Sequence, residues 1–415
     1  MGLFIIVFEG GINYVVNIEL VKNLCQKTKT KIVMVVVDGI GGLPYSVTRR
    51  TALEEAKTPN LNKLAAISSC GAIEPVALGV TPGSGPSHLA LFGYDPLKYE
   101  IGRGVLEALG VGIELTSLDV AARGNFCTVD SSDIITDRRA GRIPTEENER
   151  LVKMLRSVKV DGVEIILKPG KFHRFVVVFR GADLCGELED TDPQYVGKKP
   201  KNAIAKIKKA VYTADLINEW ITKAKKVIGN ESPANMILLR GFASLPEIPS
   251  MSQSFKLTPA AIASYPMYRG LAKLVGMDIL ETGLEIKDEI ETLKEYYDDY
   301  DFFYFHVKDT DSAGEDGDFQ RKVQVIEEFD SYVPEISQLK PDVFIVTGDH
   351  STPAVMKAHS WHPVPFLIRS EFVRPQGIEE FGESVCEQGN LGIFPSLGAL
   401  PLALAHGLKL SKFGA

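Results

Sequence analysis

Short, unbroken runs of apolar residues are the clearest pattern along the chain, and they predict buried β-strands. These runs lie at residues 32–37, 302–305, 343–346 and 364–368. Runs of this length, rich in β-branched and aromatic residues and without polar alternation, are typical of strands covered on both faces. Helical patterns lie between them, for example at 61–66 and 319–329. This alternation predicts an α/β fold whose mostly parallel sheet has helices on both faces.

The middle of the chain has a different pattern. Residues 174–179 and 236–239 have the composition of strands, and 181–200 form a loop rich in Asp, Gly, Pro and Lys. Apolar residues recur at helical spacing through 202–228, which predicts one long amphipathic helix. We therefore predict a smaller α/β domain at 121–260, inserted into a domain made of 1–120 and 261–415.

Length and charge limit the classes of function. With 415 residues the chain is too long for one ordinary core. Its net charge of −8 argues against nucleic acid and anionic membrane as partners. An acidic protein that binds an anionic small molecule must gather arginine, lysine or metal locally. The oligomeric state stays open.

Cysteine usage and the start of the chain bear on location. The five cysteines are scattered and form no CxxC pair, which argues against a disulfide framework and favours a reducing, cytoplasmic compartment. No apolar run is long enough for a transmembrane helix. The apolar stretch 3–8 lacks a preceding basic region, so a signal peptide is not expected. Residues 1–30 are either an extra edge strand or a loosely attached extension.

Acidic and histidine residues follow three of the predicted strands. Asp38 ends the first, Asp349 and His350 follow the third, and His359 comes shortly after. The second is followed by an acidic stretch at 309–318. In open α/β sheets ligands gather at the carboxyl ends of strands, and carboxylate with imidazole suits zinc, manganese or similar ions better than calcium. Because two ligand types end one buried strand at Asp349–His350, we favour metal binding over a structural role there.

Other polar residues in these segments have simpler explanations. A single Asp after a strand is more often a helix cap or turn residue, which we expect for Asp309, Asp316 and Asp318. His306 is expected to pack within its strand, and His406 to be structural.

Asp311 and Glu315 are four residues apart. On a helix both side chains would project from one face and could bind one ion. A solvated acidic turn is the alternative, and the spacing alone does not decide between them.

A glycine-rich loop offers a candidate nucleophile. Ser84 lies between Gly83 and Gly85, and Pro86 is favoured in the first turn of a helix. Ser84 would then stand at a helix N-terminus, where backbone N–H groups favour an anion. A metal-bound serine there can ionise and attack phosphorus. The alternative is a plain loop in which Ser84 or Ser87 caps the helix.

Taken together, these segments identify a family. The chain resembles the archaeal type of 2,3-bisphosphoglycerate-independent phosphoglycerate mutases, members of the alkaline phosphatase superfamily. The resemblance runs from about residue 31 to the C-terminus. It rests on VVVDGIGGLP, AKTPNLNKLA, TPGSGPSHLALFGYDP, RGNFCTVD, DRRAGRI, HVKDTDSAGEDGD, TGDHSTP and HSWHPVPFLIR, in that order.

The resemblance implies an alkaline-phosphatase-like domain with an inserted cap, a phosphorylated Ser84 and interconversion of 3-phosphoglycerate and 2-phosphoglycerate. It implies two divalent ions and no 2,3-bisphosphoglycerate. Manganese is favoured, with magnesium, zinc and cobalt as alternatives. The implied ligands of one ion are Asp38, Ser84, Asp349 and His350, and those of the other are Asp311, Glu315 and His359. The implied substrate-binding residues are Arg123, Asn125, Asp137, Arg138, Arg142 and Arg240.

The sequence departs from the family pattern at one implied ligand. Where the family has Gly-His-Asp-Gly-Asp, this chain has glutamate at position 315. A carboxylate can still coordinate, but it adds negative charge and prefers harder ions. Two other functions therefore stay open: a metal-dependent phosphatase or other phosphomutase of the superfamily, and a catalytically impaired metal-binding homologue.

Overall fold

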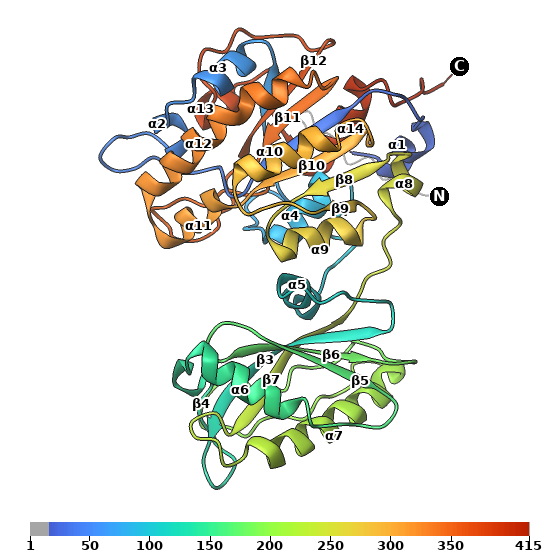
Figure 1. Ribbon diagram of the computed structural model, residues 1–415, viewed down its shortest axis with the longest axis vertical. Coiled ribbons are helices and arrows are strands. Elements are labelled where there is room, and N and C mark those ends of the chain that lie inside the picture. Colours follow the sequence, from blue (N-terminus) through green and yellow to red (C-terminus); the bar gives the residue numbers. More distant parts are fainter. Residues whose placement is uncertain (1–15, 415) are drawn as a thin grey trace, which may run out of the picture. The chain divides into compact units, whose positions relative to one another are not determined.

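The computed structural model describes residues 16–414, and these form two compact units (Figure 1). Unit 1 comprises residues 16–95, 251–262 and 281–414. Unit 2 comprises 96–250 and 263–280. Unit 2 begins before residue 121 because helix α5 (Arg103–Gly110) packs on its sheet, where Gly104 lies against the backbone of Ala121.

A mostly parallel sheet forms the centre of unit 1, as predicted. Its strands are β1 (Ile32–Val37), β2 (Ser69–Glu74), β8 (Pro259–Ile262), β10 (Phe302–Val307), β11 (Val343–Thr347), β12 (Val364–Ser370) and β13 (Ile393–Pro395). They lie in the order β13-β2-β12-β11-β1-β10-β8. β1 runs parallel to both β10 and β11, and every residue of β1 is buried. Only β12 runs antiparallel to its neighbours in this series.

Helices cover the sheet of unit 1 (Figure 1). They are α1 (Ile18–Leu24), α2 (Ala52–Glu55), α3 (Pro59–Ala66), α4 (Ser84–Leu91), α8 (Met251–Phe255), α10 (Ile286–Glu295), α11 (Asp309–Asp316), α12 (Phe319–Gln338), α13 (Glu383–Glu387) and α14 (Ala399–His406). Asp318 caps α12 by accepting the Arg321 N–H at 3.0 Å, as its position predicts. Pro59 opens α3, where a missing N–H costs nothing.

Unit 2 is an antiparallel sheet with helices on both faces. The long strand β3 (Asp119–Val129) pairs with β4 (Ile135–Asp137), β6 (Arg174–Arg180) and β7 (Met236–Ser244), and β5 (Glu164–Pro169) pairs with β6. Alternate residues of each strand point to opposite faces. One face packs on α6 (Thr145–Leu155) and α7 (Val211–Ile228), and the other packs on α5. α9 (Pro266–Leu274) and β9 (Asp278–Leu280) complete the unit.

The predicted helix at 202–228 is too long, because α7 begins only at Val211. Residues 202–207 instead run beside the helix. The Asn218 side chain accepts the Ala203 N–H at 2.8 Å and donates to the Ala203 carbonyl at 2.9 Å. A side chain of α7 therefore provides the hydrogen bonds that helical backbone would otherwise supply.

The expectations for the start of the chain have mixed outcomes. The apolar stretch 3–8 lies outside the described residues. Within residues 16–30, α1 replaces the alternative of an edge strand, and Asn17 caps it by accepting the Leu20 N–H. Among the described residues, no helix is long and apolar enough to cross a membrane.

Candidate metal centre

Three neighbouring parallel strands bring the predicted polar residues to one edge of the unit 1 sheet. In register, Val37 of β1 lies beside Val307 of β10, and Val36 lies beside Thr347 of β11. The loops that follow these strands therefore start side by side. They carry Asp38, the acidic stretch of α11, and the Asp349–His350 pair.

A first group of candidate ligands consists of Asp38, Asp349 and His350. All three are fully buried, and one ligand atom from each lies within 4.8 Å of the others. His350 Nε2 lies 3.1 Å from Asp349 Oδ2 and 3.5 Å from Asp38 Oδ1. Ser84 Oγ lies 3.2 Å from the same nitrogen. Ser84 is the first residue of α4, as the sequence predicted.

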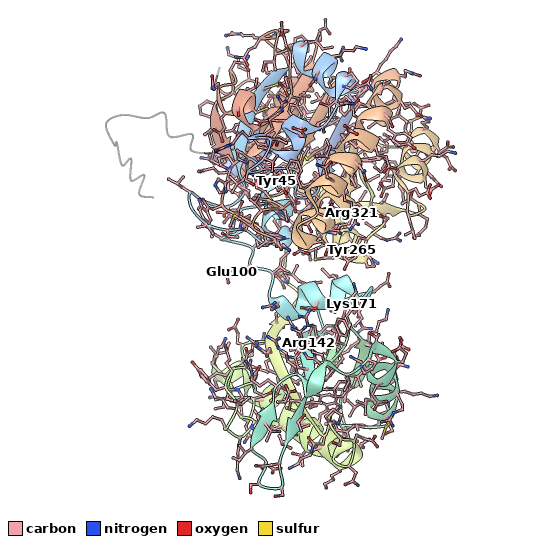
Figure 2. All side chains as sticks on the ribbon, turned by 90° about the vertical axis from the view of Figure 1, so that its left-hand side faces the viewer. Tyr45, Glu100, Arg142, Lys171, Tyr265 and Arg321 are labelled. Atoms are coloured by element: carbon pink, nitrogen blue, oxygen red, sulfur yellow. The ribbon has the colours of Figure 1, made fainter. Side chains whose placement is uncertain are left out.

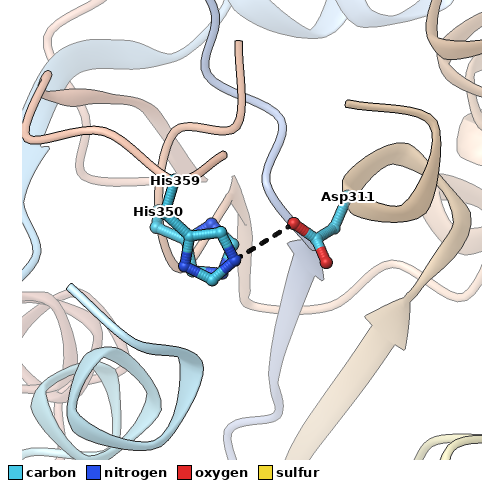
Figure 3. Close-up of side chains that lie close together, drawn as sticks. All are labelled: Asp311, His350 and His359. Atoms are coloured by element: carbon cyan, nitrogen blue, oxygen red, sulfur yellow. Dashed lines mark ion pairs between the residues drawn. The ribbon is translucent and has the colours of Figure 1, made fainter. Parts of the chain in front are cut away.

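A second group consists of Asp311, His350 and His359, drawn together in Figure 3. His359 Nε2 lies 3.5 Å from Asp311 Oδ1, and the two imidazole rings stack with centroids 3.7 Å apart. His350 therefore belongs to both groups, although the resemblance assigned it to one ion only.

Hydrogen bonds fix the orientation of the His350 ring. Thr352 Oγ1 donates to Asp311 Oδ1 at 2.8 Å and lies 3.0 Å from His350 Nδ1. Because that hydroxyl has a single hydrogen, Nδ1–H must be the donor in the second contact. The lone pair of neutral His350 is then on Nε2 and faces the first group. Such a partner on the far nitrogen is the usual arrangement for histidine ligands of metals.

Glu315 lies at the rim of this centre. It is on α11, one turn after Asp311, and Oε1 is 3.8 Å from His359 Nε2. Its side chain is 57% exposed, and it is not part of either closely spaced group. Partial burial and the charge of Asp311 raise the pKa of the Glu315 carboxyl.

The charges of the centre fit divalent cations. Burial and the carboxylates of Asp38 and Asp311 raise the pKa of Asp349 well above its usual range. The buried Asp349 Oδ2 accepts no hydrogen bond from any described residue. Burial lowers the pKa of His350 to about 4, so its imidazole is neutral at pH 7. Buried carboxylates with neutral imidazoles are costly without a cation and are good ligands for one.

Lys308 is a residue of this site that the sequence analysis did not single out. Its Nζ lies 3.0 Å from Asp38 Oδ2 and 2.5 Å from Asp311 Oδ2, so it contacts a carboxylate of each group. Burial opposes its charge, but Asp38 and Asp311 raise the pKa of Lys308 above its ordinary value. Its position directly after β10, among acidic residues, was the available signal.

Two further histidines line the buried side of the centre. His88 Nδ1 lies 2.8 Å from the Ser84 carbonyl oxygen and 3.4 Å from Asp349 Oδ2. Burial lowers its pKa to about 3. His306 is buried within β10, as expected, with Nε2 3.4 Å from Asp38 Oδ2. His88 was not predicted from the sequence, although it is one helical turn from Ser84.

The candidate substrate-binding residues all lie in unit 2. Arg123 on β3 lies opposite Arg240 on β7, and Arg123 also pairs with Glu107 at 3.2 Å. Asn125, two residues further along β3, is on the same face of the strand as Arg123. Arg138 makes a bidentate contact with Asp192, at 2.7 and 3.0 Å.

The turn after β4 shows a structural role for one of these candidates. Asp137 Oδ1 accepts the Arg139 N–H and Oδ2 accepts the Gly141 N–H, both at 2.7 Å. Asp137 thereby folds the turn that carries Arg138 and Arg142. Arg142 and Lys171 lie at the same end of this unit (Figure 2).

Positive charge gathers around a buried histidine of unit 2. Burial, and with it the charges of Arg174, Arg123, Arg139 and Arg142, lowers the pKa of His173 to about 4. This part of the unit is therefore suited to an anion.

Comparisons with known proteins agree on one family. A family model described as 2,3-bisphosphoglycerate-independent phosphoglycerate mutase matches residues 65–235. A protein of Aquifex aeolicus named probable 2,3-bisphosphoglycerate-independent phosphoglycerate mutase is 50% identical to this chain, over 96% of this chain and 100% of the relative. A protein of Deinococcus radiodurans with the same name is 48% identical, over 96% of this chain and 99% of the relative. A solved cofactor-independent phosphoglycerate mutase from Thermoplasma acidophilum is 29% identical with a TM-score of 0.75, over 91% of this chain and 100% of that one.

Proposed function

The chain belongs to the 2,3-bisphosphoglycerate-independent phosphoglycerate mutase family, and from that premise we propose that it interconverts 3-phosphoglycerate and 2-phosphoglycerate through a phosphorylated Ser84. One observation carries the assignment of the nucleophile. Ser84 begins α4, and its Oγ is 3.2 Å from His350 Nε2, the nitrogen that faces the buried carboxylates. A phosphate on Ser84 would lie at the N-terminus of α4, where backbone N–H groups favour an anion.

Two groups of side chains would hold divalent ions. Asp38, Ser84, Asp349 and His350 would bind one ion, and Asp311, His359 and the rim carboxylate of Glu315 would bind the other. Bound there, such ions lower the pKa of a serine hydroxyl and offset the charge of phosphoryl oxygens. Manganese is favoured because the donors mix carboxylate and imidazole, with magnesium, zinc and cobalt as alternatives.

The phosphoryl group would be transferred in two steps. First, Ser84 Oγ loses its proton and forms a bond to phosphorus, while the bond from phosphorus to the substrate oxygen breaks and that oxygen gains a proton. Second, the other hydroxyl of the glycerate attacks the phosphoserine and reverses these changes. The ammonium of Lys308 contacts Asp38 and Asp311, and it would add positive charge beside the reacting phosphoryl group.

The arginines of unit 2 would bind the carboxylate of the substrate. Candidates are Arg123, Arg138, Arg142 and Arg240, with Asn125 beside them. Guanidinium groups bind carboxylates through two parallel hydrogen bonds, which also fixes orientation. The glycerate must stay bound while Ser84 is phosphorylated. Otherwise water takes the phosphoryl group, and the same centre acts as a phosphatase.

The test uses Ser84→Ala beside Ser87→Ala. Ser87 is on the same helix, and its hydroxyl donates to the Gly83 carbonyl at 3.0 Å, so its loss is a matched control. We expect Ser84→Ala to abolish mutase activity in an enolase-coupled assay with Mn²⁺, and Ser87→Ala to keep it. Mass spectrometry of the acid-quenched wild type should find phosphate on Ser84. Appreciable mutase activity in Ser84→Ala would exclude it as the nucleophile, and free phosphate as the main product would instead indicate a phosphatase.

A further inference from the structure

A fully buried lysine lies beneath the loops that carry the candidate metal ligands. Lys322 is in the first turns of α12 and has no exposed surface. Its Nζ donates to the carbonyl oxygens of Gly39 at 2.7 Å, Gly41 at 2.9 Å and Thr352 at 2.9 Å. An ammonium has three hydrogens, so each one is used on backbone. Such full satisfaction is what makes a buried charge tolerable.

These three carbonyls belong to the two loops of the first group. Gly39 and Gly41 follow Asp38, and Thr352 follows the Asp349–His350 pair. The loops are also bonded to each other. The Gly39 N–H donates to Asp349 Oδ1 at 3.1 Å, and the Thr352 N–H donates to the Gly41 carbonyl at 3.0 Å. Lys322 therefore joins two segments that are more than three hundred residues apart in sequence.

The same contact extends to the second group. The Thr352 backbone bonds to Lys322, while the Thr352 side chain donates to Asp311 and accepts from His350. Space around these loops is tight as well. A Cβ at Gly39 would come within 2.5 Å of Thr352 Oγ1 and 3.0 Å of Asp311, so the loop has little room to shift.

Taking from the proposed function only that these side chains are metal ligands, we propose that Lys322 is a positioning residue that assembles both ligand groups before any ion binds. It acts through backbone carbonyls and through Thr352, and its ammonium touches none of the reacting atoms. Its role is to hold the loops after β1 and β11 at the spacing that the ligands need.

A purely electrostatic role would have the opposite sign. Lys322 is a positive charge near several carboxylates, so its removal alone would make the centre more negative and strengthen the binding of a dication. Removal of a positioning residue frees the loops and weakens binding. The direction of the change in Mn²⁺ affinity therefore separates the two roles.

The experiment compares Lys322→Met with Lys409→Met in the full chain. Lys409 is also a buried lysine of unit 1, and its Nζ lies 3.1 Å from Asp301 Oδ2. The Asp301 carbonyl accepts the N–H of Ile32, so this pair lies at the start of β1, the opposite end of that strand from Asp38. Loss of either lysine should lower stability, but only loss of Lys322 should affect the metal centre.

Mn²⁺ binding is measured by electron paramagnetic resonance, with circular dichroism as the check on folding. We expect the Mn²⁺ dissociation constant of Lys322→Met to rise by about tenfold or more, a size typical of residues that orient metal ligands, and that of Lys409→Met to stay unchanged. Unchanged or tighter binding in a folded Lys322→Met would overturn the assignment. A wild type that binds no Mn²⁺ would instead contradict the proposed function.

Hydrogen exchange of the wild type gives an answer that needs no variant. If Lys322 assembles the loops in advance, the amides of Gly39 and Thr352, which bond each loop to the other, exchange slowly in metal-free protein. Fast exchange that becomes slow only after Mn²⁺ is added would show that the ion, and not Lys322, orders the loops. Because it uses the wild type, this measurement decides the matter even where Lys322→Met does not fold.

Discussion

A carboxylate at position 315 would add negative charge beside the second ligand group. The Glu315 side chain is more than half exposed, and its Oε1 is 3.8 Å from His359 Nε2, so it would lie close to an ion bound by that nitrogen. Compared with neutral imidazole, a carboxylate raises affinity for any dication and leaves less Lewis acidity for a phosphate. It also favours hard ions over soft ones.

We therefore expect Glu315→His to bind Mn²⁺ and Mg²⁺ more weakly and to turn over faster per bound Zn²⁺ or Co²⁺. The measurement is the dissociation constant and rate for each ion. A control is Asp316→Ala, because Asp316 is the exposed neighbour that pairs with Arg321. Metal analysis separates ligand from bystander: two ions per wild-type chain and fewer in Glu315→Ala support coordination, whereas one ion in both proteins contradicts it.

Candidate site residues at the ends of strands were easier to predict from the sequence than a residue that contacts the site from within a helix. Asp38 and Asp349 were predicted because parallel strands end at a common edge. Lys322 was not, because it is in the middle of a helical pattern and its partners are carbonyl groups. Every residue has a backbone carbonyl, so the residue types around Lys322 in the sequence do not indicate its partners. The contact is seen only in the structure, where α12 packs against the two loops.

The strands could be predicted from their apolar pattern, whereas the start of α7 could not. The continuous apolar runs of β1 and β11 are typical of strands that are buried on both faces of a sheet. The helical spacing before Val211 was correct as a pattern, but Asn218 binds the Ala203 backbone and holds residues 202–207 outside the helix. A tertiary hydrogen bond of this kind cannot be read from periodicity.

Trp220 is the test of how α7 stabilises unit 2. Its indole is fully buried and meets the ring of Phe179 on β6 edge to face, with centroids 5.5 Å apart. We expect Trp220→Ala to lower the free energy of unfolding of this unit by about 3–5 kcal/mol, because the surrounding side chains cannot fill the cavity that the substitution leaves. Tyr212→Ala, an exposed residue of the same helix, should change it by less than about 0.5 kcal/mol. Equal losses in urea denaturation would mean that Trp220 is not a core anchor.

The whole molecule divides the proposed chemistry between its units: nucleophile and metal ligands in unit 1, arginines in unit 2. If Arg138 helps to retain glycerate, Arg138→Ala should release more free phosphate per isomerisation, since glycerate escapes before the second transfer. Enolase-coupled and phosphate-release assays on one sample give the ratio. Arg180→Ala is the control, because Arg180 makes the same kind of bidentate pair, with Asp119, in the same unit. An unchanged ratio in Arg138→Ala would contradict a retained glycerate.

Metal should also stabilise the two units unequally, and the chain has the probes to show it. Among the described residues, both groups of candidate metal ligands are in unit 1. Of the two tryptophans, Trp361 is in unit 1 and Trp220 in unit 2. Trp220→Phe and Trp361→Phe therefore each leave one fluorophore that reports a single unit. An ion that binds only the folded state adds about 2.7 kcal/mol at a concentration one hundred times its dissociation constant.

We accordingly expect Mn²⁺ to raise the thermal midpoint followed by Trp361 and to leave that followed by Trp220 unchanged, with EDTA reversing the shift. The physical reason is that a bound ion stabilises the cooperative unit that contains its ligands. The other unit is stabilised as well only if the two units unfold together. Equal shifts at both tryptophans would show that the two units unfold as one. A shift at Trp220 alone would place the metal in unit 2 and contradict the assignment of Asp38, Asp311 and Asp349 as ligands.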